Sequence, residues 1–170
     1  MDLGRAGKVG IFTGATANIG RGIALELARE GVKLVAVGRD GEAGAKLVEA
    51  ARAAGAADAV FVTADLLDPE APARILAEAE KLGPVDVLVN NVGGNVDQGL
   101  FVESDPGKWF KDIDLNFGTV LRMTHAVLPG MVARKGGAIV NVGSTAGIVG
   151  DYMLPVYSAM KGAVHSFTVV

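Results

Sequence analysis

Residues 8–30 read KVGIFTGATANIGRGIALELARE and join two different patterns across a glycine-containing turn. The first six residues form a short apolar run, typical of a strand buried on both faces. From Gly20 onward, alanine and leucine alternate with charged residues at helical spacing, which predicts a helix over Gly20–Glu30. A strand that passes through a glycine-containing turn into a helix N-terminus suits phosphate binding, because free backbone N–H groups and the helix dipole point at the anion.

The same alternation continues along the rest of the chain and predicts repeated strand–helix–strand units. Right-handed crossovers between parallel strands then give an α/β fold, a Rossmann-type doubly wound parallel sheet with helices on both faces and the strand order 3-2-1-4-5. No internal repeat or linker divides the sequence, so we expect a single dinucleotide-binding domain over residues 1–170. The expected strands are Lys8–Thr13, Lys33–Val37, Ala59–Thr63, Val85–Asn90 and Ala138–Val142; the expected helices are Gly20–Glu30, Glu42–Ala54, Pro69–Leu82, one within Ser104–Arg134, and one from Pro155 onward.

Composition argues against several classes of protein. Half of the 170 residues are hydrophobic, and the net charge of −3 comes with no long run of lysine or arginine, so a nucleic-acid partner is not expected. The sequence holds no cysteine and two histidines, which argues against a metal site. It has neither an apolar run long enough to cross a membrane nor the pattern of a signal peptide, so we expect no membrane partner and a cytoplasmic location.

Tyr157 and Lys161 are the most informative polar pair. Their i, i+4 spacing places both side chains on one face of the expected last helix. A tyrosine phenol is ordinarily too weak an acid for proton transfer at neutral pH, and an adjacent ammonium stabilises its phenolate. Ser144 follows the fifth expected strand and precedes Tyr157 by 13 residues. A hydroxyl there can hold a carbonyl oxygen near the tyrosine proton. Taken singly, the pair also fits a solvated helix surface, and Ser144 fits a strand-end cap.

Together these motifs resemble the short-chain dehydrogenase/reductase family. That family carries Thr-Gly-x-x-x-Gly-x-Gly after its first strand, which Thr13, Gly14 and Gly20 match, while Asn18 replaces the middle glycine. Asparagine tolerates a left-handed backbone, so the turn can keep its shape. The Asn90–Gly93 segment is similar to the family's Asn-Asn-Ala-Gly motif.

The resemblance implies roles for the polar residues. Ser144 orients the substrate oxygen, Tyr157 transfers the proton, Lys161 assists Tyr157 and holds the ribose, and Asn116 supports a proton relay. The cofactor-binding residues carried over from the family are Thr13, Gly14, Thr16, Asn18, Ile19, Gly20, Arg39, Asp65, Leu66, Asn91, Gly93, Tyr157 and Lys161.

The residue after the second expected strand bears on the choice of cofactor. An acid there would bind the ribose 2′-hydroxyl of NAD, whereas an arginine would accept the 2′-phosphate of NADP. Gly38 occupies the position of the acid and Arg39 follows it, which favours NADP. Asp40 keeps NAD open as an alternative, and Arg39 also fits a solvated surface residue.

The resemblance implies hydride transfer between a nicotinamide cofactor and a carbonyl or secondary alcohol, with 3-oxoacyl reductases and hydroxyacyl dehydrogenases as the most similar branch. It also implies a homo-oligomer, formed through the helix within Ser104–Arg134 and the Tyr157 helix, if the fold is complete. The family fold usually continues for several dozen residues beyond Val170, so we expect the last strands to be missing. A second hypothesis follows, in which the chain is a truncated dinucleotide-binding fragment without catalytic activity.

Overall fold

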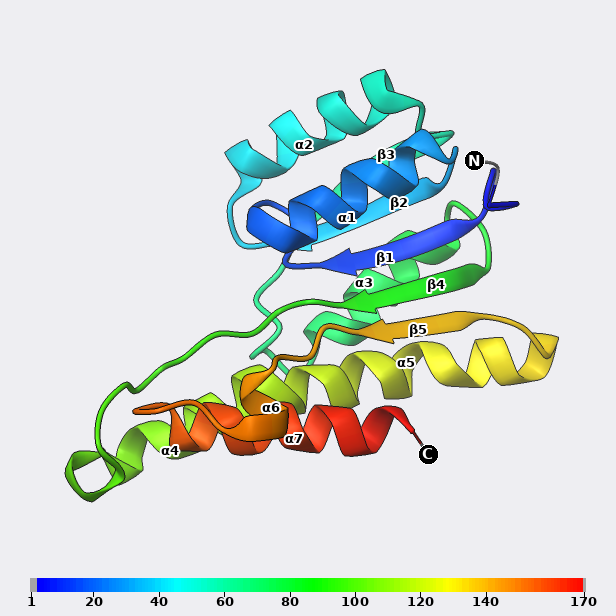
Figure 1. Cartoon of the computed structure of the whole chain (residues 1–170). Coiled ribbons are helices and arrows are strands. Elements are labelled where there is room, and N and C mark those ends of the chain that lie inside the picture. The colour runs from blue at the N-terminus through cyan, green and yellow to red at the C-terminus, as the bar shows by residue number, and fades with distance from the viewer. Residues whose placement is uncertain (1–2, 170) are drawn as a thin grey trace.

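A computed structural model describes residues 3–169 and shows a five-stranded, fully parallel sheet with the order β3-β2-β1-β4-β5 (Figure 1). This order confirms the Rossmann-type prediction. The strands are β1 (Val9–Thr13), β2 (Lys33–Gly38), β3 (Asp58–Thr63), β4 (Val85–Asn90) and β5 (Ala138–Asn141). The helices are α1 (Asn18–Arg29), α2 (Gly41–Ala54), α3 (Ala71–Glu80), α4 (Pro106–Ile113), α5 (Thr119–Arg134), α6 (Ala146–Val149) and α7 (Pro155–Thr168), with shorter turns η1 (Phe101–Glu103) and η2 (Asp114–Gly118).

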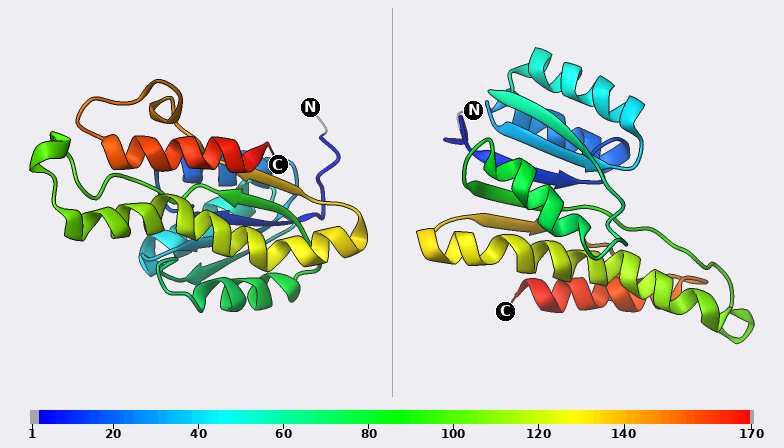
Figure 2. Two further views of the ribbon diagram at one scale, coloured as in Figure 1. Left: turned by 90° about the horizontal axis from the view of Figure 1, so that it is seen from below. Right: turned by 180° about the vertical axis from the view of Figure 1, so that it is seen from behind.

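Helices cover both faces of the sheet, as Figures 1 and 2 show. Alternate side chains of β1 point to opposite faces. Ile11 belongs to a core cluster with Ile75 of α3 and Met123 of α5. Phe12 belongs to a second cluster with residues of α1 and α2, such as Leu47. Because both faces of the central strands are buried, these strands are nearly continuous apolar runs rather than alternating ones.

The predicted helix within Ser104–Arg134 is interrupted in the structure. The Asp105 carboxylate accepts a hydrogen bond from the backbone N–H of Gly107 at 2.8 Å, which caps α4 at its start. The segment η2 is a π-helical turn and separates α4 from α5. Single π-turns are rare and often occur at functional sites, because the extra residue redirects side chains and frees backbone groups. Periodicity alone did not predict this turn.

The last described helix, α7, packs against α6, α4 and η2. Phe167 of α7 meets Phe117 of η2 edge to face, with ring centroids 5.9 Å apart. The strand β5 lies at one edge of the described sheet and is one residue shorter than predicted, although the Val142 N–H still donates to the carbonyl of Asn90 at 2.8 Å. The start of α7 at Pro155 agrees with the prediction, whereas α6 was not predicted.

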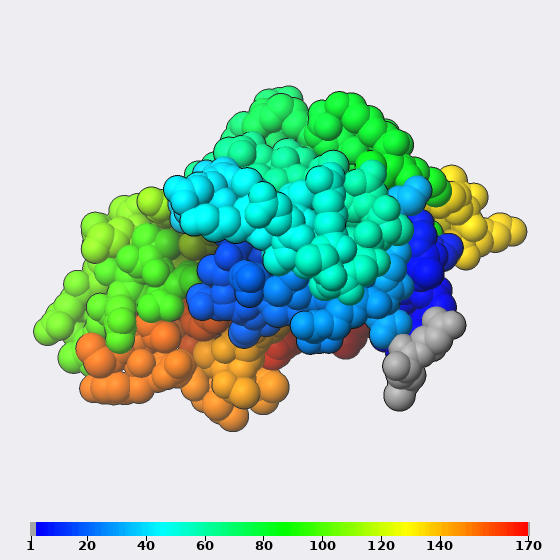
Figure 3. Space-filling model, turned by 90° about the horizontal axis from the view of Figure 1, so that it is seen from above, coloured from blue at the N-terminus to red at the C-terminus, as the bar shows by residue number. Residues whose placement is uncertain are grey.

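The segments before α4 and before α7 lie side by side at one end of the molecule, where the green and orange surfaces meet in Figure 3. The N–H of Gly99 donates to the carbonyl of Met153 at 2.9 Å and joins them. Both segments follow the carboxyl ends of strands, where ligands bind in open α/β sheets. Across residues 3–169, no helix combines the length and hydropathy needed to cross a bilayer.

Candidate functional site

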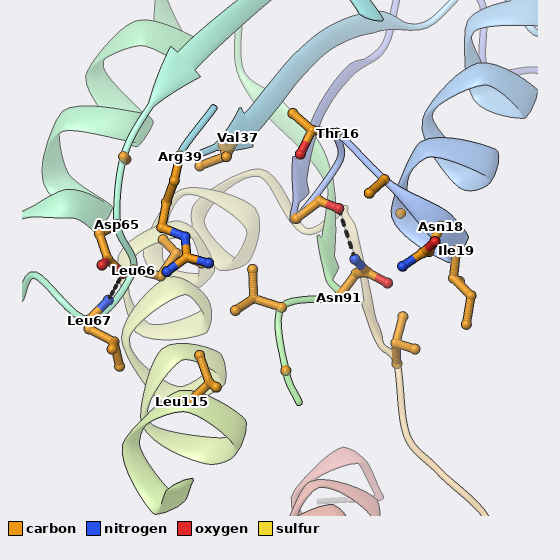
Figure 4. A pocket seen from close by; sticks show the side chains of 18 of the residues that line it. Thr16, Asn18, Ile19, Val37, Arg39, Asp65, Leu66, Leu67, Asn91 and Leu115 are labelled. Carbon is orange, nitrogen blue, oxygen red and sulfur yellow. Dashed lines mark hydrogen bonds between the residues drawn. The ribbon is translucent and has the colours of Figure 1, made fainter. Parts of the chain in front are cut away.

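A cleft of about 580 Å³ opens at the carboxyl ends of the strands, and Figure 4 shows many of the side chains that face it. It is formed by the turn after β1, by the segments that follow β2, β3, β4 and β5, and by α4, η2 and α7. This is the position at which the strand order reverses between β1 and β4, as expected for a dinucleotide site. The predicted site residues that line it are Gly14, Thr16, Asn18, Ile19, Gly20, Arg39, Asp65, Leu66, Asn91, Gly93, Tyr157 and Lys161.

The turn after β1 depends on close backbone approach. Asn18 has a left-handed backbone with φ of 46°, so the replacement of glycine by asparagine is accommodated as predicted. A Cβ atom on Gly20 would lie 2.2 Å from the carbonyl oxygen of Gly14, so a side chain at position 20 cannot fit without moving the turn. The Asn91 side chain donates from Nδ2 to the carbonyl oxygens of Thr13 and Gly14, at 3.1 and 3.2 Å. The turn is therefore held open by packing and by a specific amide.

Thr13 is a predicted cofactor contact that the structure does not bring to the cleft. It is 1% exposed, and its hydroxyl donates to the carbonyl of Val89 at 3.1 Å. The same oxygen accepts the backbone N–H of Asn91 at 2.9 Å. Thr13 therefore ties the end of β1 to the end of β4 and supports the cleft from behind.

The charged residues along the cleft are mainly cationic. Arg39, Lys111 and Lys161 line it, and Asp65 is the one carboxylate among the described lining residues. Figure 4 shows the exposed Arg39 side chain extending from the end of β2 to a position beside Leu66. Asp65 accepts the N–H of Leu67 at 3.0 Å, which orders the segment after β3. Such a charge balance suits a ligand that carries several phosphate groups.

Asp40 has a structural role. Its carboxylate accepts the N–H of Ala43 at 3.0 Å and caps the start of α2, and it does not line the cleft. Arg39, in contrast, makes no hydrogen bond or ion pair within residues 3–169. The neighbouring residues thus differ in function, one capping a helix and the other reaching into the cleft.

Tyr157 and Lys161 lie on one face of α7 and both line the cleft, in agreement with their spacing. The Nζ atom of Lys161 lies 5.8 Å from the centre of the Tyr157 ring and donates to the carbonyl of Val142 at 2.8 Å. Lys161 is 4% exposed, and burial lowers the pKa of its ammonium below the ordinary value. The side chain thus brings a positive charge out of solvent to the edge of the cleft, next to a phenol.

Asn116 and Ser144, the other two predicted catalytic residues, are not among the residues that line the cleft. Asn116 lies in η2 with 0% exposure and bonds the backbone of Gly94 in both directions: its Oδ1 accepts the N–H at 2.9 Å and its Nδ2 donates to the carbonyl at 2.8 Å. Ser144 is half-buried, and its Oγ accepts the N–H of Ala146 at 3.1 Å at the start of α6. The side chain of Asn116 is fully engaged with protein, so any relay role would fall to its backbone or to the groups it orders.

Sequence reasoning missed several lining residues. Lys111 and Leu115 face the cleft from α4 and η2, four residues apart. Val37, Ala64, Val92 and Val142 supply apolar surface at the strand ends. A helical projection of the segment before Asn116 would have placed Lys111 and Leu115 on one face. Within residues 3–169, no group of three or more His, Asp or Glu side chains is arranged to hold a metal ion.

The glycines around the cleft fit a bound dinucleotide. A Cβ on Gly14 would lie 2.9 Å from the Asn91 amide, and one on Gly93 would lie 2.9 Å from Asn116 Oδ1 and 3.1 Å from Lys161 Nζ. Backbone without side chains therefore forms the cleft wall near the turn and near Lys161. A pyrophosphate needs such close backbone approach at the turn, and a nicotinamide ribose needs open space beside the lysine.

Comparison with known proteins identifies the family. Residues 8–170 match the family model described as short chain dehydrogenase, so the chain belongs to that family and the predicted resemblance is confirmed. Proteins of this family use NAD(P) cofactors.

Individual relatives share about a third of the sequence. The chain is 38% identical to a 3beta-hydroxysteroid dehydrogenase of Mediterraneibacter gnavus, over 95% of this chain and 58% of that protein. It is 34% identical to the 3-oxoacyl-(acyl-carrier-protein) reductase FabG of Pseudomonas aeruginosa, over 95% and 65%. It is also 34% identical to an acetoacetyl-CoA reductase of Allochromatium vinosum, over 95% and 66%. The chain thus spans about three fifths to two thirds of the length of these relatives.

Proposed function

We propose that this chain carries the cofactor-binding and proton-transfer residues of an NAD(P)-dependent oxidoreductase that interconverts a carbonyl and a secondary alcohol. The observation that carries the proposal is the pairing of Tyr157 with the buried Lys161 at the edge of a cationic cleft. A bound nicotinamide would supply or accept the hydride. The protein's own residues would bind the cofactor and move the accompanying proton.

We assign to the polar residues the roles that the family resemblance implies. Tyr157 donates a proton to the carbonyl oxygen in reduction and accepts one from the alcohol in oxidation. The ammonium of Lys161 stabilises the negative charge left on the phenol oxygen and holds the cofactor ribose. Ser144, after β5, donates a hydrogen bond to the reacting oxygen and keeps it near Tyr157. Asn116 orders the backbone of Gly94 beside this group.

We propose NADP as the preferred cofactor. Arg39 has a free, exposed guanidinium at the end of β2, and a planar guanidinium binds phosphate through paired hydrogen bonds. The carboxylate of Asp40, the competing acid, caps the start of α2 instead. Asp65 is the remaining carboxylate along the cleft, and it orders the loop after β3.

The names of the relatives suggest the substrate class. They include reductases of 3-oxoacyl and acetoacetyl groups and a hydroxysteroid dehydrogenase. All three names describe the interconversion of a ketone and a secondary alcohol, which is the reaction class proposed for Tyr157 and Lys161. We therefore propose a 3-oxoacyl or hydroxyacyl compound as the small-molecule substrate. A chain that binds NADP(H) without turnover is the second candidate, favoured by the position of Ser144, which does not line the cleft.

We also propose a homo-oligomer that uses α5 and α7. Leu121 and Leu128 of α5 are exposed and, with Phe167 of α7, line an apolar groove of about 750 Å³ between α3, α5 and α7. Exposed apolar surface of this kind marks association sites. The mass of the protein in solution measures this directly.

The test is a fluorescence titration of the purified chain with NADPH and NADH, followed by turnover with 3-oxoacyl thioesters and cyclic ketones. Tyr157→Phe removes one hydroxyl and should lower turnover at least about a hundredfold with little change in cofactor affinity. Tyr152→Phe makes the same change at a tyrosine that is 79% exposed and outside the cleft, and it should leave turnover intact. Equal effects of the two variants would refute the role of Tyr157. Cofactor binding without turnover in the unmodified chain would favour the second candidate.

A further inference from the structure

A buried carboxyl group lies one helical turn before Asn116. Asp112 of α4 is 1% exposed, and its Oδ1 accepts a hydrogen bond from Asn116 Nδ2 at 2.7 Å. Its Oδ2 is also buried and accepts no hydrogen bond of ordinary geometry from the described residues, although the backbone N–H groups of Val96 and Asp97 lie near the carboxyl. Burying a carboxyl group is costly unless its neighbours compensate, so the contact of Asp112 with Asn116 is the feature to explain.

The surroundings of Asp112 favour its neutral form. Burial raises the pKa of this carboxyl, while the backbone N–H groups of Val96 and Asp97 and the Asn116 amide act in the opposite direction. The Asp97 carboxylate adds to the increase, although an ion pair with Lys108, at 3.2 Å, partly offsets its charge. Of the lysines nearest in sequence, Lys108 is thus paired elsewhere and Lys111 faces the cleft.

The side-chain amide of Asn116 can form its hydrogen bonds in only one of its two orientations. Its Oδ1 meets a donor, the N–H of Gly94, while its Nδ2 meets three acceptors: Gly94 O, Asp112 O and Asp112 Oδ1. Rotating the amide by half a turn would place oxygen against oxygen at the three acceptors. The carboxyl oxygen of Asp112 is the one acceptor in this set that belongs to a side chain, and it is therefore the one that substitution can remove.

The Gly94 bonds connect Asn116 to the cleft wall. Gly93, the preceding residue, lines the cleft, and its Cα borders both Asn116 and Lys161: a Cβ there would lie 2.9 Å from Asn116 Oδ1 and 3.1 Å from Lys161 Nζ. A change in the Asn116 amide would therefore shift the backbone against which the Lys161 ammonium packs.

We propose that Asp112 is a positioning residue that acts through Asn116, fixing its amide and thereby the path of Gly93–Gly94 beside Lys161. This inference rests on the proposed oxidoreductase function. A purely structural role predicts a different outcome, in which Asp112→Val lowers the free energy of unfolding, because the Asn116 amide loses one acceptor, but leaves the turnover of the folded protein unchanged. A variant of Asp112 that lacks the acceptor oxygen but still folds distinguishes the positioning role from the structural role.

The experiment compares Asp112→Asn, which keeps an acceptor oxygen, with Asp112→Val, which removes it at similar size. The Asn116 side-chain amide is followed by NMR, with its signals identified by their loss in Asn116→Asp. In the unmodified protein and in Asp112→Asn we expect slow hydrogen exchange at this amide; in Asp112→Val we expect shifted signals and faster exchange. We expect the NADPH dissociation constant to stay within about threefold in both variants. Turnover should fall about tenfold or more in Asp112→Val, with KM little changed, and should be largely retained in Asp112→Asn.

The outcomes are distinguishable. An unmodified protein without turnover would contradict the proposed function, and the Asn116 signals would still decide the role of Asp112. Unchanged Asn116 signals in a folded Asp112→Val protein would overturn the inference, as would equal loss of turnover in both variants. If Asp112→Val does not fold, Asp112→Ser supplies a short side chain that cannot reach the amide, and the same criteria apply to it.

Discussion

Substituting Gly20 by alanine should damage the cleft at its narrowest point. The added Cβ would lie 2.2 Å from the carbonyl oxygen of Gly14 and 2.4 Å from the Asn91 amide nitrogen. One of these atoms is backbone, and the other is held by two hydrogen bonds, so neither can move without opening the turn. Overpacking of this kind costs about 1–3 kcal/mol. For a protein of this size, that lowers Tm by roughly 2–12 °C.

The same substitution should weaken cofactor binding. The proposed cofactor would lose backbone contacts to its pyrophosphate at a displaced turn, and a loss of about 1.4 kcal/mol of binding free energy lowers affinity tenfold. The assay is a fluorescence titration with NADPH beside a thermal melt of the same sample. We expect at least a roughly tenfold rise in the dissociation constant together with the lower Tm.

Gly22 provides the matched control, two residues further along α1. It is exposed, and a Cβ there would meet no atom within 4 Å. Alanine in an exposed helix is more stable than glycine by about 0.5–1 kcal/mol, so Gly22→Ala should raise Tm by roughly 1–4 °C and leave affinity unchanged. If Gly20→Ala binds NADPH as tightly as Gly22→Ala, the reasoning that the turn depends on this close approach is refuted.

Three further predictions address the cofactor, the support of the cleft and a buried acid. Arg39→Ala should weaken NADPH binding by roughly tenfold to a hundredfold and NADH binding by less than about twofold, and equal losses in the two titrations would contradict the role of Arg39. Thr13→Val leaves the N–H of Asn91 without its acceptor and should lower the free energy of unfolding, measured by urea titration, by about 1–3 kcal/mol. Thr13→Ser keeps the hydroxyl and should have a free energy of unfolding close to that of the unmodified protein. The pKa of Asp112 is raised in the folded state, so as pH rises this carboxyl ionises first in the unfolded chain. The free energy of unfolding therefore falls as pH rises from the ordinary aspartate pKa to the pKa in the folded state, and is constant above it. The side chain in Asp112→Asn cannot ionise, so this variant should have a higher Tm than the unmodified protein at pH 7. The difference in Tm should become smaller as pH falls toward the ordinary aspartate pKa. A difference in Tm that does not change with pH would contradict this prediction.

The sheet and the backbone of the glycine-containing turn after β1 were predictable because local signals determine them. Continuous apolar runs separated by helical patterns determine parallel strands, and right-handed crossovers then leave the order 3-2-1-4-5. Asn18 could be placed in a left-handed turn because few other residues tolerate that backbone. The shared face of Tyr157 and Lys161 followed from helical geometry alone.

Other features depend on contacts that no local pattern carries. Thr13 was expected to face the cofactor, but its hydroxyl bonds β4, whose residues lie more than 70 positions away in sequence. Asn116 is joined to Gly94, 22 residues away, and only the fold brings them together. The burial of Asp112 and the π-helical turn at η2 likewise depend on how α4 packs, because an aspartate in a helix otherwise favours the solvent side.

Two of the three cations that line the cleft, Arg39 and Lys161, should respond differently to ionic strength. Arg39 is exposed at the rim, where mobile ions screen charge over about 8–10 Å at physiological salt. Lys161 is 4% exposed and donates to a backbone carbonyl, so salt has little access to it. Added salt should therefore loosen the hold on a phosphorylated cofactor while the proton-transfer step, once the complex is formed, proceeds at much the same rate. Capture of the cofactor and its use would then be governed by separate electrostatic environments within one cleft.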